Sequence, residues 1–70
     1  MENHTQSQQQ ARYMRVAEVA KKLGIGKSTV WAFTKQDVSF PQPIHLSTRV
    51  TVWVEHELDA FVVSKRTTMH

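Results

Sequence analysis

The stretch VAEVAKKLGIGKSTVWAFTK, residues 16 to 35, decides the fold of this chain. Its first part repeats apolar side chains at the spacing i, i+3, i+4 and i+7, which predicts an amphipathic helix over residues 16 to 23. The residues on that stripe are Val16, Val19, Ala20 and Leu23. Gly24 is expected to end the helix in a left-handed conformation, Ile25 to turn into the core, and Gly26 to cap a second helix. Two helices joined by so tight a turn are typical of a helix-turn-helix.

The second helix is predicted over about residues 27 to 36, and its side chains divide between two faces. Val30 and Phe33 share one face and are expected to pack against the first helix. The other face carries Lys27, Ser28, Trp31 and Lys35. A helix with such a face suits the major groove of double-stranded DNA, where it would meet phosphates and base edges.

The second half of the chain predicts a hairpin and a third helix. Phe40-Pro41-Gln42-Pro43 stops helical structure, because each proline lacks an N–H and holds the preceding residue extended. Strands over residues 44 to 46 and 50 to 54 are expected to enclose a turn at residues 47 to 49. A helix follows over about residues 55 to 65, with an inward stripe of Leu58, Phe61 and Val62. This order of elements predicts an α+β fold, a small winged helix-turn-helix.

Composition predicts one small domain between two tails. Residues 1 to 12 contain almost no apolar side chain and are expected to be disordered, because they bury too little surface to offset the entropy of ordering. The domain is expected over residues 13 to 66, and residues 67 to 70 are expected to fray. The sequence has no cysteine, no signal-peptide core and no membrane-spanning run, which favours a cytoplasmic protein.

Positive charge is distributed unevenly along a chain whose net charge is +3. In residues 12 to 53, many lysines and arginines stand against only Glu18 and Asp37. In residues 54 to 70, Glu55, Glu57 and Asp59 outnumber the cations. A one-sided basic field attracts a polyanion. The plain alternative is a solvated surface that keeps the protein soluble.

The chain resembles the AlpA-like regulators of prophages and integrative elements, which are related to small phage excisionases and more distantly to MerR-type winged domains. The resemblance spans residues 15 to 61 and rests on Arg15-Val16, Glu18-Val19-Ala20, Leu23-Gly24, Ser28-Thr29-Val30-Trp31, Phe40-Pro41-x-Pro43, Leu46, Arg49, Trp53 and Leu58. It implies a bacterial or phage protein associated with the nucleoid. Such relatives bind DNA near an integrase gene or attachment site. Some activate transcription of the integrase, and others act as excisionases, the recombination directionality factors.

The expected DNA-binding residues are Lys27, Ser28, Thr29, Trp31, Lys35, Arg49 and Arg15. Arg49, at the tip of the wing, is expected in or beside the minor groove, and Arg15 is expected to meet a phosphate. Thr29 lies between the two faces of its helix. Trp31 has two interpretations, packing in the core or lying against sugar and phosphate, and we favour the second. For the lysines and Arg49 the plain alternative is surface charge without a partner, whereas Trp53 is interpreted as core.

Enzymatic and metal-dependent functions are not expected. The four histidines, His4, His45, His56 and His70, show no metal-ligand spacing, and no catalytic triad or phosphate-binding loop is present. We expect no cofactor. The integrase is a further candidate partner, and several copies are expected to bind DNA cooperatively. The alternative function is a protein-binding module that contacts a recombinase or regulator without DNA, with Trp31 as its hot spot.

Overall fold

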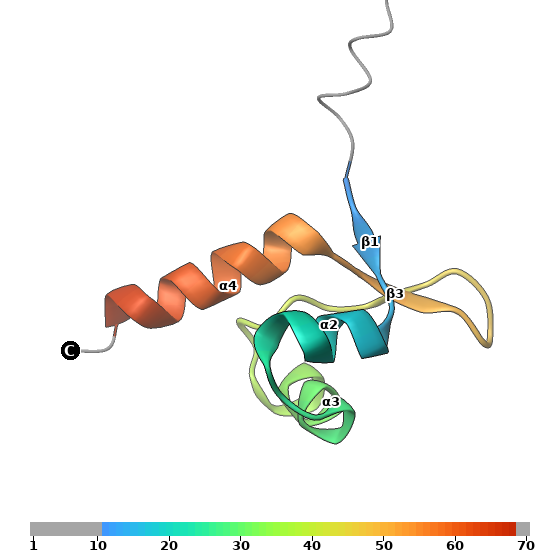
Figure 1. Ribbon diagram of the computed structural model, residues 1–70, viewed down its shortest axis with the longest axis horizontal. Helices are drawn as coiled ribbons and strands as arrows, with labels where there is room; N and C mark the ends of the chain where they lie inside the picture. Colours follow the sequence, from blue (N-terminus) through green and yellow to red (C-terminus); the bar gives the residue numbers. More distant parts are fainter. Residues whose placement is uncertain (1–10, 69–70) are drawn as a thin grey trace, which may run out of the picture.

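The computed structural model describes residues 11–68, with side chains described as far as residue 66. In order the elements are β1 (Tyr13–Met14), α2 (Val16–Leu23), α3 (Lys27–Gln36), β2 (Ile44–His45), β3 (Thr51–Val54) and α4 (Glu55–Thr68) (Figure 1). Within this range, three helices and one three-stranded antiparallel sheet make the expected α+β architecture of a small winged helix-turn-helix.

The helix-turn-helix begins and ends at the predicted residues. Gly24 has φ 73°, and its N–H donates to the Ala20 carbonyl at 2.8 Å, which closes α2 in the left-handed conformation that glycine adopts easily. Gly26 caps α3, and its carbonyl accepts from the Val30 N–H at 3.1 Å. At the start of α2, the Glu18 carboxylate accepts from the Arg15 backbone N–H at 3.0 Å. Local hydrogen bonds therefore fix the turn between α2 and α3.

The sheet has the strand order β1-β3-β2, so β3 pairs on both sides. Residues 13–14 pair with 54–53, and residues 44–45 pair with 52–51, both antiparallel. The predicted hairpin is confirmed, although its strands are shorter than expected, at 44–45 and 51–54. The sequence did not predict β1, which extends the wing hairpin into a sheet and brings the N-terminal end of the domain against β3.

The core lies between the sheet and the three helices. Its fully buried side chains are Trp53, Phe40, Leu58, Val19 and Val30. Trp53 is therefore a core residue, as predicted, and its strand neighbours Val52 and Val54 are also buried. Ile25 packs against the same cluster, as expected for the turn.

An aromatic cluster ties α3, the proline-rich loop and α4 together. The rings of Phe33 and Phe40 stack at 5.4 Å, and Phe61 meets both at its edges, at 5.7 and 4.9 Å. α4 continues to Thr68, beyond the expected end near residue 65. Residues 1–10 and 69–70, assigned to the tails, lie outside the described residues.

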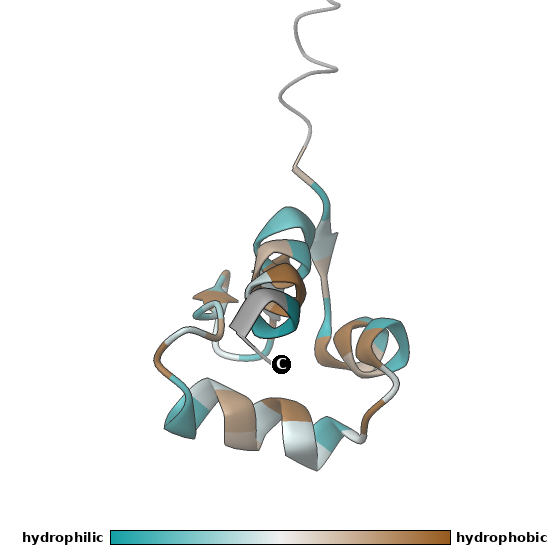
Figure 2. Cartoon of the chain, turned by 90° about the vertical axis from the view of Figure 1, so that its left-hand side faces the viewer, coloured by the Kyte–Doolittle hydropathy of each residue, from teal (hydrophilic) through white to brown (hydrophobic). Residues whose placement is uncertain are grey.

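Ala11 and Arg12, the last residues of the predicted tail, are described. The Arg12 carbonyl accepts from the Glu55 N–H at 2.8 Å, which adds a backbone contact next to the pairing of β1 with β3. Figure 2 looks along α4 towards the body of the molecule, with α3 running across its lower edge. α4 and the wing extend in opposite directions from this body (Figure 1).

Candidate nucleic-acid interface

The outward face of α3 carries the side chains that the sequence assigned to DNA. Lys27, Ser28, Thr29, Trp31 and Lys35 are all exposed. On the opposite face Val30 is fully buried and Phe33 is half-buried against the core, so the predicted division of the helix is confirmed. α3 forms the lower edge of the molecule in both views (Figures 1 and 2). Its outward side chains are therefore accessible to a partner.

Trp31 combines features of both interpretations made from the sequence. Its side chain is 37% exposed, so it belongs to the outward face. Its ring also meets the ring of the buried Trp53 edge to face, with 5.1 Å between centroids and 63° between planes. One side of the indole thus rests on the core while the rest remains available to a ligand.

One outward position of α3 was not among the residues predicted to bind DNA. Gln36 is exposed, and with Thr29, Ala32 and Phe33 it lines a shallow depression of about 230 Å³. Ser28, Ala32 and Gln36 follow one another at spacing i, i+4, i+8, which places them along one line of the helix. That spacing could have identified Gln36, whose amide has the donor and acceptor needed to read an adenine edge.

The wing is the loop between β2 and β3, and it projects away from α4 (Figure 1). Its ends are joined by the Leu46 N–H, which donates to the Val50 carbonyl at 2.8 Å. At the tip, the Arg49 N–H donates to the Ser47 hydroxyl at 3.3 Å, and the Arg49 side chain is exposed. Arg49 therefore lies at the tip, as predicted, on a loop that its own hydrogen bonds shape.

The candidate cations make no ion pair with any side chain that the structure describes. In the part of the chain with described side chains, no ion pair involves Arg15, Lys27, Lys35 or Arg49. Arg15 is exposed at the N-terminus of α2, where the helix end itself is electropositive. Each of these side chains can therefore contact a phosphate without first breaking an internal ion pair.

On the other side of the molecule, several charged side chains form ion pairs between elements. Lys22 of α2 lies 3.1 Å from the Glu55 carboxylate and 3.0 Å from that of Asp59, both on α4. Asp59 and Glu55 raise the pKa of Lys22 above its ordinary 10.5. Glu55 also lies 3.8 Å from Arg12. The expected role of these acids, to stabilise α4, thus includes holding α2 and the N-terminal end of the domain against it.

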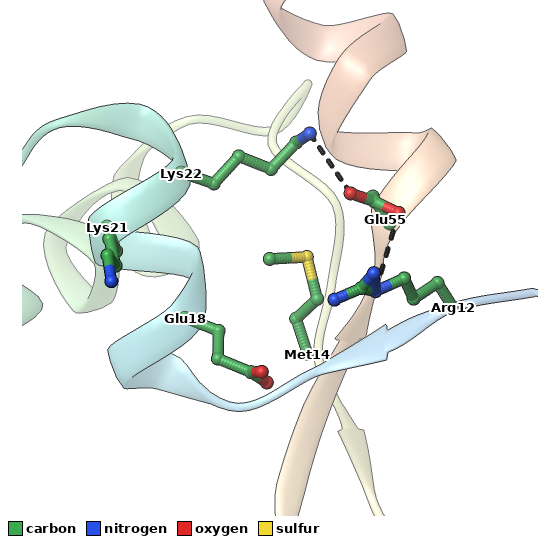
Figure 3. A pocket seen from close by; sticks show the side chains of 6 residues that line it. All are labelled: Arg12, Met14, Glu18, Lys21, Lys22 and Glu55. Atoms are coloured by element: carbon green, nitrogen blue, oxygen red, sulfur yellow. Dashed lines mark hydrogen bonds and ion pairs between the residues drawn. The ribbon is translucent and has the colours of Figure 1, made fainter.

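Figure 3 shows this charged corner around a shallow pocket of about 300 Å³, lined by Arg12, Met14, Glu18, Lys21, Lys22 and Glu55. Glu55 faces both Lys22 and Arg12 in this corner, so its carboxylate is taken up by ion pairs within the protein. A second cross-element pair joins the end of α3 to α4, with 3.0 Å between the Lys65 amine and the Asp37 carboxylate. The Ser39 hydroxyl at 2.6 Å, then Lys65, lower the pKa of Asp37 to about 2.

Two further findings concern the described part of the chain. It holds no group of three or more histidine, aspartate or glutamate side chains placed to bind a metal ion. None of its helices has the length and apolar character needed to cross a membrane.

The arrangement of elements and the exposed basic face define the class, a small winged helix-turn-helix protein. Residues 12–67 match the model of the family described as the prophage CP4-57 regulatory protein (AlpA), and the chain belongs to this family. The resemblance seen in the sequence is thereby confirmed. The family is one of regulators and is not an enzyme family. No curated protein and no solved structure matches the chain at a significant level.

Proposed function

We propose that the chain is a sequence-specific DNA-binding protein of a mobile element, which acts as an excisionase, as a transcriptional regulator of the integrase gene, or as both. The observation that carries this proposal is a set of exposed cations on α3 and the wing that make no ion pair with the described side chains: Lys27, Lys35 and Arg49. Phosphate neutralisation supplies most of the affinity of such interfaces. Membership of a prophage regulatory family supports the same function.

In this proposal α3 enters the major groove and the wing follows the adjacent minor groove. Lys27 and Ser28, in the first turn of α3, meet phosphates or base edges, as the N-terminal residues of a recognition helix do. Lys35 and Arg15 contact phosphates, and Thr29 reaches a base or backbone edge. Arg49 lies in the narrow minor groove, where A·T tracts concentrate negative potential.

Several copies would bind side by side. A single small DNA-binding module covers only about 600 to 1,000 Å² of its own surface, which limits both affinity and specificity. We therefore expect cooperative binding to an array of sites, with the integrase as a further partner in excision. Equal affinity per site for an array and for an isolated site would exclude this cooperativity.

The second candidate function is a protein-binding module, favoured by the exposed indole of Trp31 on a basic face. Salt separates the two candidates. DNA binding through several phosphates weakens steeply between about 50 and 200 mM salt, whereas an interface centred on one tryptophan weakens much less.

The test is an NMR titration of labelled protein with duplex DNA from the integrase and attachment region of its own element. A random duplex at the same salt is the control. We expect shifts concentrated at residues 27–36 and 47–50, larger with the native duplex. Absent shifts, or equal and diffuse shifts with both duplexes, would exclude sequence-specific recognition and favour the protein-binding alternative.

A further inference from the structure

Trp31 and Trp53 join two elements that are separated in the sequence by the whole proline-rich loop and wing. Trp31 stands on the outward face of α3, and Trp53 stands on β3, the strand that leads from the wing into the core. Their rings meet edge to face at 5.1 Å. This geometry is favourable for aromatic rings and restricts how each ring can tilt against the other. The pair is therefore a direct contact between the helix and the strand that carries the wing.

The other ring contacts of α3 lead away from the wing. Phe33 contacts Phe40 in the proline-rich loop and Phe61 in α4. The backbone of α3 packs mainly against α2. Within the described residues, Trp31 is thus the aromatic side chain of α3 that reaches the sheet.

Packing holds Trp53 in place. Its indole Nε1 is buried and has no hydrogen-bond partner among the described residues. Its orientation consequently depends on the side chains around it, which include Met14 from the neighbouring strand and the ring of Trp31. A change at Trp31 would loosen this ring and, through β3, the base of the wing, whose tip residue Arg49 lies only two positions before β3 begins.

We infer that Trp31 is a positioning residue, whose contact with Trp53 fixes the angle between α3 and the wing so that the two read neighbouring grooves at one spacing. This inference rests on the proposed DNA-binding function. It assigns to Trp31 a role beyond touching DNA, because the angle is set inside the protein before any duplex is bound. The protein would therefore bind more weakly to sites in which the segments contacted by α3 and by the wing have a different spacing along the duplex.

The test compares two duplexes. The first is the preferred duplex selected by the wild-type protein from a random pool, and the second carries one extra base pair between the segments protected by α3 and by the wing. The insertion moves the wing's target by about 3.4 Å along the axis and about 34° around it. We expect the wild type to bind the second duplex about tenfold more weakly. For Trp31→Ala we expect weaker binding overall and a ratio near one, whereas Trp31→Phe restores the wild-type ratio.

Lys35→Ala is the matched control, since Lys35 shares the outward face but makes no ring contact. It should weaken binding to both duplexes equally and leave the ratio unchanged. If Trp31→Ala also keeps the wild-type ratio, Trp31 contacts DNA or the core only, and the inference is wrong while the proposed function stands. If the wild type selects no sequence, the proposed function fails and the inference with it. Should Trp31→Ala not fold, Trp31→Leu, which keeps apolar volume without a flat ring, carries the same expectation.

Discussion

The α4 side of this small protein and its α3 side differ in ion pairing: every ion pair among the described side chains includes a residue of α4, and none includes a cation of α3 or the wing. On the side of α4, Lys22 is held by Glu55 and Asp59, and Lys65 by Asp37, all across element boundaries. On α3 and the wing, Lys27, Lys35 and Arg49 point outward with no ion pair in the described structure. The acids that could neutralise the basic residues are concentrated where the helices are tied together. The ion pairs of the α4 side therefore stabilise the fold, whereas the cations of α3 and the wing remain accessible to an anionic ligand.

Removing an aromatic anchor of the α4 side should have the largest effect. Phe61 is 8% exposed and meets both Phe33 and Phe40. Phe61→Ala is expected to lower the free energy of unfolding by about 3 to 5 kcal/mol. A core of this size rarely supplies more than about 3 to 5 kcal/mol, so the variant should be largely unfolded at room temperature. Urea unfolding followed by circular dichroism measures this.

Phe61→Leu is the control for that experiment, because it keeps most of the apolar volume and should retain the fold. If Phe61→Ala unfolded at the same urea concentration as the wild type, α4 would contribute little to the stability of the core. The α4 side could then no longer be described as the side that stabilises the fold.

The double variant Lys27→Ala, Lys35→Ala should weaken DNA binding while leaving the fold intact. Each lost phosphate contact is expected to reduce the slope of log affinity against log salt by about 1, hence by about 2 for the pair. Fluorescence anisotropy over a salt series measures the slope. Arg66→Ala removes the same kind of charge from exposed α4 and should change the slope little. If the slope decreased equally in both variants, the whole surface of the protein, rather than α3, would attract DNA.

Local pattern was sufficient to predict the helix-turn-helix. The apolar stripe of residues 16–23, the left-handed Gly24 and the cap at Gly26 each depend on neighbours within a few positions. The burial of Trp53 was predicted equally well, because an aromatic residue between a hairpin and an apolar helix is expected to pack into the core. The outward face of α3 was predicted by the same periodicity that predicted its buried face.

Contacts between distant segments could not be predicted in this way. β1 is two residues long, too short for any periodicity, and exists through its pairing with residues 53–54. Lys22 and Glu55 are separated by 33 positions, and the sequence around either residue does not indicate that their side chains form an ion pair. The edge contact of Trp31 with Trp53 belongs to the same category. These long-range contacts decide which charges and which aromatic surfaces remain exposed.

Breaking the Lys22 pairs should have a smaller effect, confined to stability. Lys22→Met keeps the apolar stem of the side chain but removes the charge shared by Glu55 and Asp59. Because exposed ion pairs contribute little, we expect a small decrease in the melting temperature. DNA affinity should change little, since this charge is already neutralised. A marked loss of affinity in Lys22→Met would place α2 in the interface.

Acid should release the Asp37 contact, which is the smallest effect. The folded-state pKa of Asp37 is lowered from 3.8 to about 2, first by the Ser39 hydroxyl and then by Lys65. A lowered folded-state pKa means that ionised Asp37 stabilises the fold above pH 3.8, and that this contribution is lost as the pH falls towards 2. Asp37→Asn keeps an acceptor for Ser39 but cannot ionise. Its stability difference from the wild type, measured by urea unfolding, should therefore be constant near neutral pH and shrink within that acid range. A difference that persists unchanged down to pH 2 would mean that the stabilisation does not come from the charge of Asp37.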